Sequence, residues 1–411
     1  MSTAVAEPEV APVARRRGLL LLILGALSAI GPLSIDMYLP AFPGIAGEMN
    51  AGQAQVQLTL TACLVGVSIG QVVAGPLSDV RGRRMPLLVG IAAYAVASLL
   101  CAFSPSIYGL IGFRLLQGIA GGAALVIVRA VVRDLYEGAA IARIFATLML
   151  VSGLAPILAP IAGAQLLNHT SWRGVFVSLS VVGLLLLAAA LSGVRETLPR
   201  DRRESGGLGH TLVTFGRLLR NRAFMASALA GGLGFGGMFA YISGSPFVLQ
   251  QVYGVSPQTF SLVFALNALS LTLTAQIGGR LAGRRVAPAR LILIGLFLSM
   301  AGAGMLLVTA LFDLPLAMLI AALSVMMCGA GFVLPGTGAL ALAGQPQQVA
   351  GSASALTGVL QFALGAIAAP LVGLGGEGSA LPMASVLAGL TFAAFAVFVG
   401  LRRAPAGVSM G

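Results

Sequence analysis

The sequence predicts an all-helical integral membrane protein with twelve transmembrane helices in two pseudo-symmetric six-helix bundles. Hydrophobic residues make up 58% of the 411 residues and charged residues only 9%. A soluble domain of this size would lack the polar surface needed to cover its core, so lipid must surround most of the chain. A hydrocarbon layer of about 30 Å requires about 20 apolar residues per helix, which leaves room for roughly a dozen spans.

The apolar stretches fall into two groups of six, separated by one long polar stretch. The first six are expected near 19–42, 55–78, 85–103, 106–131, 141–167 and 173–194. The second six are expected near 222–249, 256–279, 289–311, 314–341, 348–374 and 380–401. The predicted organisation is a cytoplasmic tail (1–18), a bundle (19–194), a cytoplasmic linker (195–221), a second bundle (222–401) and a cytoplasmic tail (402–411).

The basic residues predict the orientation of the chain. All 24 are arginines, and they cluster between apolar segments instead of interleaving with aromatic residues, which argues against a nucleic-acid partner despite the net charge of +12. With the first tail inside, the inside loops carry nearly all loop arginines, and the outside loops carry only Arg173. By the positive-inside rule, both termini face the cytoplasm.

The two halves repeat each other in sequence. Gly75–Arg84, after the second span, corresponds to Gly278–Arg285, after the eighth, and Ala159–Gly163 corresponds to Ala369–Gly373. Two six-helix repeats with helices interrupted by proline and glycine are typical of transporters whose halves rock around a central site. We therefore expect a transporter rather than an enzyme, with the lipid bilayer around a monomer.

Two ionisable residues lie well inside the predicted spans, Asp36 and Arg114. A charge at this depth costs at least about 2.5 kcal/mol, so it normally faces a water-filled cavity and a partner. Asp36 is the candidate proton carrier, because burial, a neighbouring arginine and arriving substrate all change the affinity of a carboxylate for protons. A purely structural Asp36–Arg114 ion pair is the alternative.

The motif that begins at Arg114 offers further polar contacts. Gln117 lies three residues on and can share the helix face of Arg114, while Gly118, Gly121 and Gly122 permit close helix packing. Arg114 could hold a carbonyl or hydroxyl group of a substrate or tune Asp36; alternatively, it bonds free carbonyls of a neighbouring helix.

A second group of residues is expected to control gating. Around the loop after the second span, Gly75, Asp79, Gly82, Arg83 and Arg133 could form a polar cluster that breaks as the halves open. The alternative is a basic loop that only sets topology. In the fifth span, Pro156 and Pro160 free backbone carbonyls and bend the helix.

The candidate substrate cavity has apolar walls with a few polar groups, which suits amphipathic ligands. Its expected residues are Asp36, Tyr38, Arg114, Gln117, Phe235, Phe239, Tyr241, Phe247, Phe260, Phe264, Asn267, Gln361 and Phe362. Ordinary packing is the alternative for most of the single aromatic residues.

Nothing in the sequence predicts a cofactor or a metal. His169 and His210 lie in loops without partners at metal-ligand spacing, and Cys63, Cys101 and Cys328 are far apart in apolar runs. The chain has no lysine and hence no phosphate-binding glycine–lysine loop, so the expected energy source is the proton gradient.

These motifs resemble those of the major facilitator superfamily, and within it the twelve-helix drug:proton antiporters. Gly75–Arg84 is similar to the loop signature between helices 2 and 3, Arg114–Gly122 to the helix 4 motif, and Ala155–Gly163 to the antiporter motif. Ser34–Pro40, Arg129–Asp134 and Ala240–Phe247 resemble the Bcr/CflA branch of bicyclomycin, chloramphenicol and florfenicol exporters.

The resemblance implies proton-coupled export of small amphipathic drugs across a bacterial inner membrane, with Asp36 and Arg114 as the coupling acid and arginine. The sequence departs from the pattern at Val80 and Arg81 of the loop signature, and at Ser28, where some relatives carry a second acid. Two alternatives stay open: an exporter of an endogenous metabolite or sugar, and a non-transporting receptor or scaffold on the same fold.

Overall fold

The fold follows the predicted arrangement of twelve spans. The computed structural model describes residues 11–136, 139–200, 203, 208–283, 285–343, 345–346, 349–376 and 378–403. Within these residues, twelve helices are long and apolar enough to cross a membrane. The fold class is therefore confirmed, whereas the five domain boundaries stay predictions, and parts of both tails and of the linker lie outside the described residues.

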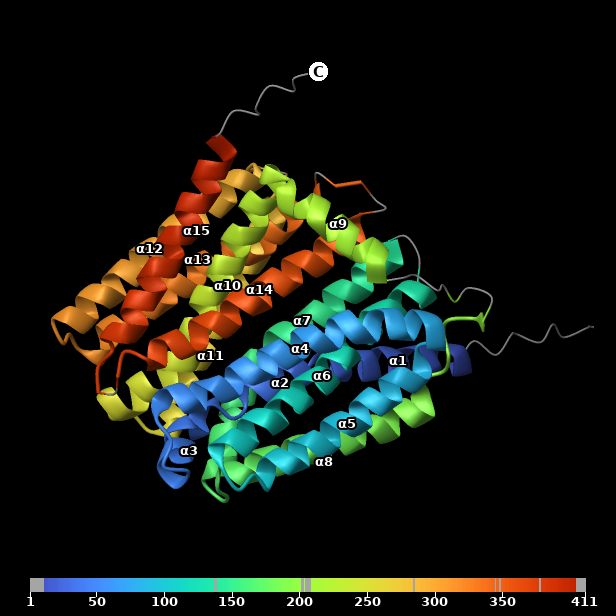
Figure 1. The fold of residues 1–411 in the computed structure, drawn as a ribbon, viewed down its shortest axis with the longest axis horizontal. Coiled ribbons are helices and arrows are strands. Elements are labelled where there is room, and N and C mark those ends of the chain that lie inside the picture. Colours follow the sequence, from blue (N-terminus) through green and yellow to red (C-terminus); the bar gives the residue numbers. More distant parts are fainter. Residues whose placement is uncertain are drawn as a thin grey trace, which may run out of the picture.

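The N-terminal half contains the first six spans (Figure 1). Its elements are α1 (Ala11–Ser28), α2 (Ile30–Asp36), the short 3₁₀ helix η1 (Leu39–Ala41), α3 (Phe42–Glu48), α4 (Gln53–Arg81), α5 (Arg84–Ala102), α6 (Ile107–Leu135), α7 (Ala139–Leu167) and α8 (Trp172–Gly193).

The C-terminal half contains the other six spans, preceded by a helix that the sequence analysis did not predict. Its elements are α9 (Leu208–Arg220), α10 (Arg222–Phe247), the π-helical turn η3 (Val248–Val252), α11 (Pro257–Leu281), α12 (Pro288–Leu311), α13 (Leu316–Ala343), α14 (Ala350–Gly373) and α15 (Leu381–Arg403). Helix α9 lies in the predicted linker and packs on α10 and α14. Buried Leu218 of α9 joins a small apolar cluster with Phe224 and Ala341.

The first span is not one continuous helix. The sequence predicts a single helix over 19–42, but the chain forms α1, α2, η1 and α3 in succession and reaches Glu48. Pro32 and Pro40 explain the interruptions, because proline lacks an N–H donor and its ring clashes with the preceding turn. The irregular segment 37–41 therefore follows Asp36 directly.

The internal repeat is visible in the helix contacts. In the N-terminal half α4 packs on α6, α5 on α6 and α5 on α8; in the C-terminal half the corresponding pairs are α11 with α13, α12 with α13, and α12 with α15. Across the two halves, α4 contacts α14 and α7 contacts α11, which are equivalent pairs under the same repeat. Figure 1 shows α4 and α14 running side by side between the halves.

Helices α4 and α6 approach closely because glycines of each face the backbone of the other. A Cβ added at Gly118 would overlap the carbonyl oxygen of Cys63, and one at Gly122 would overlap that of Val67. The predicted close packing is thus confirmed at these two positions, whereas Gly121 has ordinary contact distances to its neighbours. The contact holds Arg114 of α6 at a fixed depth against α4.

A cavity of about 680 Å³ separates the halves on the side of the linker. It is lined by the ends of α4 and α6 in one half and of α13 and α14 in the other. We call this side the linker side and the opposite side the far side. Hydrogen bonds join the halves near the far side: Gln57 Nε2 donates to the Ser243 carbonyl at 3.1 Å and Thr61 Oγ1 to the Ala366 carbonyl at 2.9 Å.

Helices α7 and α11 add further far-side contacts. Ser261 Oγ donates to the Pro160 carbonyl at 2.9 Å, and Gln258 Nε2 donates to Asn168 Oδ1 at 2.8 Å. The structure is therefore open on the linker side and closed on the far side. This is one of the two end states that alternating access requires.

The open side makes a testable prediction about chemical accessibility. Ser354 is exposed in the cavity wall, whereas Thr61 lies at the closed contact. We expect Ser354→Cys to react with a bulky maleimide in everted vesicles several times faster than Thr61→Cys, each measured above the labelling of wild type. Equal labelling of the two cysteines would contradict closure on the far side.

Candidate substrate and proton site

Asp36 ends α2 and lies buried beside the break between α2 and η1, with 4% of the residue exposed. Among the described residues it makes no hydrogen bond and no ion pair, and its electrostatic neighbour is Tyr241 of α10 in the other half. An acid buried at such a depth is costly to place there and normally has a function. Its position is suited to sensing the relative movement of the halves.

Arg114 is fully buried in α6. One guanidinium nitrogen, Nη1, donates to the Ser34 carbonyl at 3.0 Å and to Gln117 Oε1 at 2.5 Å. The guanidinium carbon lies 4.2 Å from the ring centre of Tyr38, a cation–π contact that partly compensates the buried charge. Among the described residues, Nε and Nη2 have no hydrogen-bond partner, so Arg114 retains donors for another group.

The predicted Asp36–Arg114 ion pair does not form in this conformation. The four ion pairs among the described residues involve Arg83, twice, Arg173 and Arg203. Arg114 instead binds the Ser34 carbonyl, two residues before Asp36, and Gln117 of its own helix.

The predicted substrate residues separate into two groups. Tyr38, Arg114 and Gln117 belong to a polar group in the N-terminal half, where the Tyr38 hydroxyl bonds Thr59 at 3.2 Å and Gln117 Nε2 donates to Ser98 at 2.7 Å. Thr59, Ser98 and Tyr94 were missed by the sequence analysis, because isolated hydroxyl residues in apolar runs give no distinguishing signal.

The second group lies in the C-terminal half. Tyr241 stacks on Phe264 with ring centres 5.5 Å apart, and Asn267 Nδ2 donates to the Tyr241 hydroxyl at 3.0 Å. Phe235 packs against Phe239 and Phe362, with ring centres 4.7 Å and 5.4 Å away. Phe362 and Gln361 line the cavity, whereas Phe247 and Phe260 are buried in the core nearer the far side.

The cavity wall also contains most of the predicted gating residues. Gly75, Asp79, Arg83 and Arg133 all line it, together with Arg129, which the sequence analysis did not select as a site residue. Gln71 lines the same wall. Arg129 lies in a stretch that resembles a family motif. Its spacing of four residues from Arg133 is the signal that places both on one helix face.

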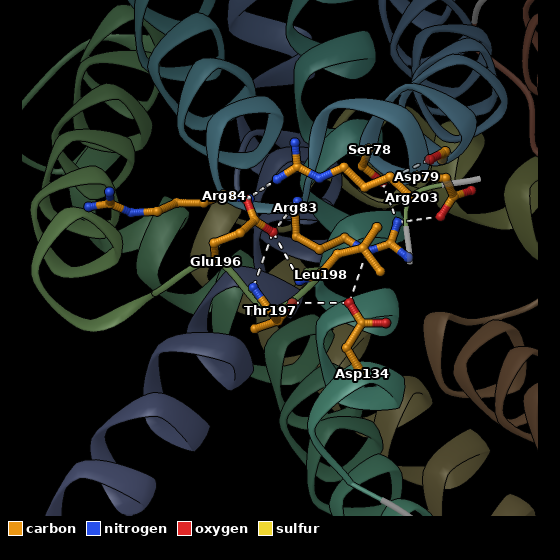
Figure 2. A network of polar contacts seen from close by, with 10 residues as sticks. Ser78, Asp79, Arg83, Arg84, Asp134, Glu196, Thr197, Leu198 and Arg203 are labelled. Atoms are coloured by element: carbon orange, nitrogen blue, oxygen red, sulfur yellow. Dashed lines mark hydrogen bonds and ion pairs between the residues drawn. The ribbon is translucent and has the colours of Figure 1, made fainter. Parts of the chain in front are cut away.

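Arg83 is the centre of the network that Figure 2 shows. Its Nη1 donates to Asp79 and to Ser78, and its Nε donates to Asp134 at 3.0 Å. Burial alone would lower the pKa of the Arg83 guanidinium, but the hydrogen bonds to Asp134 and Asp79 raise this pKa above its ordinary value. Asp79, for which Arg133 was a possible partner, pairs with Arg83, and Asp134 of α6 is the second acid that binds Arg83.

Glu196 attaches the start of the linker to this network. Its carboxylate accepts backbone N–H bonds from Arg83 at 2.7 Å and Arg84 at 3.2 Å, and from Thr197 and Leu198 at 3.1 Å (Figure 2). Gly82 makes the turn between α4 and α5 at a φ of 92°, a conformation that favours glycine. The network lies within the N-terminal half and the linker, so its predicted opening with the halves stays a prediction.

The linkage of Glu196 to pH can be measured. Burial raises the pKa of the Glu196 carboxyl, but the four backbone N–H bonds have a larger, opposite effect. The pKa is therefore below its ordinary value of 4.5. The stability that Glu196 contributes is present above pH 4.5 and is lost as the pH falls through the lower folded-state pKa. We expect Glu196→Gln to melt below wild type at pH 7, and the difference in melting temperature to shrink below pH 4.5. A constant difference would contradict this.

The prolines and far-side residues complete the site. Pro156 and Pro160 both lie inside α7, and the Pro160 carbonyl accepts the inter-half bond from Ser261. Gln57 Oε1 and Ser245 Oγ are buried without partners close to the far-side closure. Among the residues that the structure describes, no three potential metal ligands cluster.

Comparison with known protein families covers most of the chain that forms these two repeats. The Major Facilitator Superfamily profile matches residues 22–370. The chain belongs to the Major Facilitator Superfamily. It is therefore a multi-pass membrane transporter of small molecules, from a family of transporters rather than enzymes.

Relatives and solved structures agree with this assignment. The uncharacterized MFS-type transporter YdgK of Bacillus subtilis is 42% identical over 95% of this chain and 97% of its own. A bicyclomycin resistance protein homolog of Haemophilus influenzae is 30% identical over 88% and 91%, and a chloramphenicol resistance protein of Pseudomonas aeruginosa is 33% identical over 71% and 69%. A bacterial homologue of the lysosomal transporter Spinster superposes with a TM-score of 0.74 at 16% identity, covering 94% and 95% of the two chains.

Proposed function

We propose that this transporter is a proton-coupled exporter of small amphipathic drugs of the chloramphenicol, florfenicol or bicyclomycin class. The proposal depends mainly on Asp36, a buried acid that has no cationic partner among the described residues and acts electrostatically on Tyr241 of the other half. The names of the bicyclomycin and chloramphenicol resistance relatives support the substrate class. The proton gradient would supply the energy, without a cofactor.

The proposed orientation places the linker side in the bacterial cytoplasm and the far side outside the inner membrane. The arginines of the α4–α5 loop, the linker and the α11–α12 loop support it, since positive loops are retained inside. The structure then corresponds to the state that loads substrate from the cytoplasm. Deprotonated Asp36 would permit loading, the halves would rock, and a proton arriving from outside would favour release.

Drug flux tests this proposal directly. Everted vesicles containing the transporter receive radiolabelled chloramphenicol or florfenicol under an imposed pH gradient, acidic inside the vesicle. We expect uptake that exceeds empty vesicles and disappears with a protonophore. Uptake that persists without the gradient would contradict proton coupling, and no uptake by a folded protein would contradict drug export.

The same experiment separates the alternatives. An exporter of a metabolite or sugar would show flux that unlabelled drugs do not compete with. A receptor or scaffold on the same fold would bind a ligand and show no gradient-driven flux.

A further inference from the structure

Two arginines of α6 face the inter-half cavity without a carboxylate partner. Arg129 and Arg133 both line the cavity, are one helical turn apart and lie within electrostatic range of each other. Among the described residues, neither takes part in an ion pair. Like charges at this spacing repel, so the arrangement costs free energy when the cavity is empty.

The rest of the wall does not neutralise them. The third lining arginine, Arg83, is already held by Asp79 and Asp134. Among the described residues, the charged side chains that line the cavity are three arginines and one aspartate, an excess of two positive charges. Counting Asp134 behind Arg83 leaves an excess of one. The part of the wall that α13 and α14 supply contains no charged residue among those described.

A topology signal does not explain the placement. Arginines that set topology act from loops and helix ends, and their side chains need not point to a particular place. Arg290, at the exposed start of α12, is an example. Arg129 lies within α6, two turns before its end, and its side chain borders the cavity rather than the loop. A cavity with one sign of charge and low-dielectric walls concentrates ligands of the opposite sign.

We propose that the cavity prefers amphipathic molecules with an anionic group, held by Arg129 and Arg133, over neutral or cationic ones. This rests on the proposed function, because it assigns a substrate class to the same transport cavity. Phe362, which packs on Phe235 at the other wall, supplies an apolar surface for the remainder of the ligand. Among small amphipathic drugs, the preferred ligands are therefore those that carry an acidic group on an aromatic or aliphatic body.

A matched pair of probes tests the charge preference. Chloramphenicol succinate is an anion at pH 7, and its methyl ester has almost the same size without the charge. Binding of each to the purified full-length transporter is measured by calorimetry. We expect the acid to bind about tenfold more tightly than the ester at 0.01 M salt, and the ratio to approach one at 1 M salt, where the Debye length falls from about 30 Å to about 3 Å.

Variants then locate the effect. Arg129→Gln and Arg133→Gln should each reduce the preference for the acid several-fold, whereas Arg290→Gln, an exposed arginine on the same side outside the cavity wall, should retain it. Equal binding of acid and ester to wild type overturns the proposal, whether or not the variants fold. A preference that both variants keep, or binding of neither probe, also overturns it. Tight binding of the acid without any drug flux contradicts the proposed function alone.

Discussion

Replacing Asp36 with asparagine is expected to abolish gradient-driven drug uptake in everted vesicles, with a loss of at least about tenfold. Asparagine has nearly the shape of aspartate but cannot exchange a proton. The side chain is buried and acts electrostatically on Tyr241 of the opposite half, so protonation changes the charge close to the junction between the halves. Drug binding at equilibrium should also weaken, because the neutral side chain imitates the protonated acid, the form that favours release in the proposed cycle.

Asp313→Asn is the matched control for this experiment. Asp313 is an exposed acid at a φ of 47°, a backbone conformation that asparagine also accepts, and it lies between α12 and α13 away from the cavity. It should transport like wild type. Asp36→Glu should restore part of the coupling, since it keeps an ionisable group. Full gradient-dependent uptake by Asp36→Asn would remove Asp36 from the proton pathway.

Replacing Gly118 with alanine is expected to destabilise the N-terminal half by about 1–3 kcal/mol, the typical cost of overpacking a well-packed contact. The added methyl group would overlap the Cys63 carbonyl, which belongs to the α4 backbone and cannot rotate away. Helices α4 and α6 must then separate and shift Arg114. The measurement is the melting temperature of the purified transporter in detergent.

Gly112→Ala is the control on the same helix, because a Cβ at Gly112 meets nothing within 4 Å. Alanine there should leave the melting temperature unchanged or raise it slightly, since glycine costs about 0.5–1 kcal/mol in a helix interior. Equal melting temperatures of Gly118→Ala and wild type would show that the helices can part at no cost.

Several features were predictable from residues alone. Spans of about 20 apolar residues must be helical in lipid, so their number and the six-plus-six division followed from hydropathy. Asp36 and Arg114 were recognisable because charged residues at that depth are costly. Gly118 and Gly122 were recognisable because small residues recur where helices touch.

Other features depended on contacts between segments far apart in the chain. Asp134 and Glu196 contact Arg83 only because the end of α6 and the start of the linker lie beside the α4–α5 turn. Arg114 binds the Ser34 carbonyl and not Asp36, a choice of partner that depends on how α2 packs against α6. Arg129 is significant because the two halves enclose a cavity at its position.

The sequence by itself thus determined that lipid surrounds the chain, how many spans it has, and that it contains a repeat. It also determined which charged residues are too costly inside a span to lack a role. Each of these properties follows from the local transfer of side chains into lipid. Only the tertiary structure decided which half each charge faces, which side of the molecule is open and which arginines remain unneutralised. Those properties depend on how helices cross and rotate against one another, and this is the sum of many weak packing contacts between distant segments.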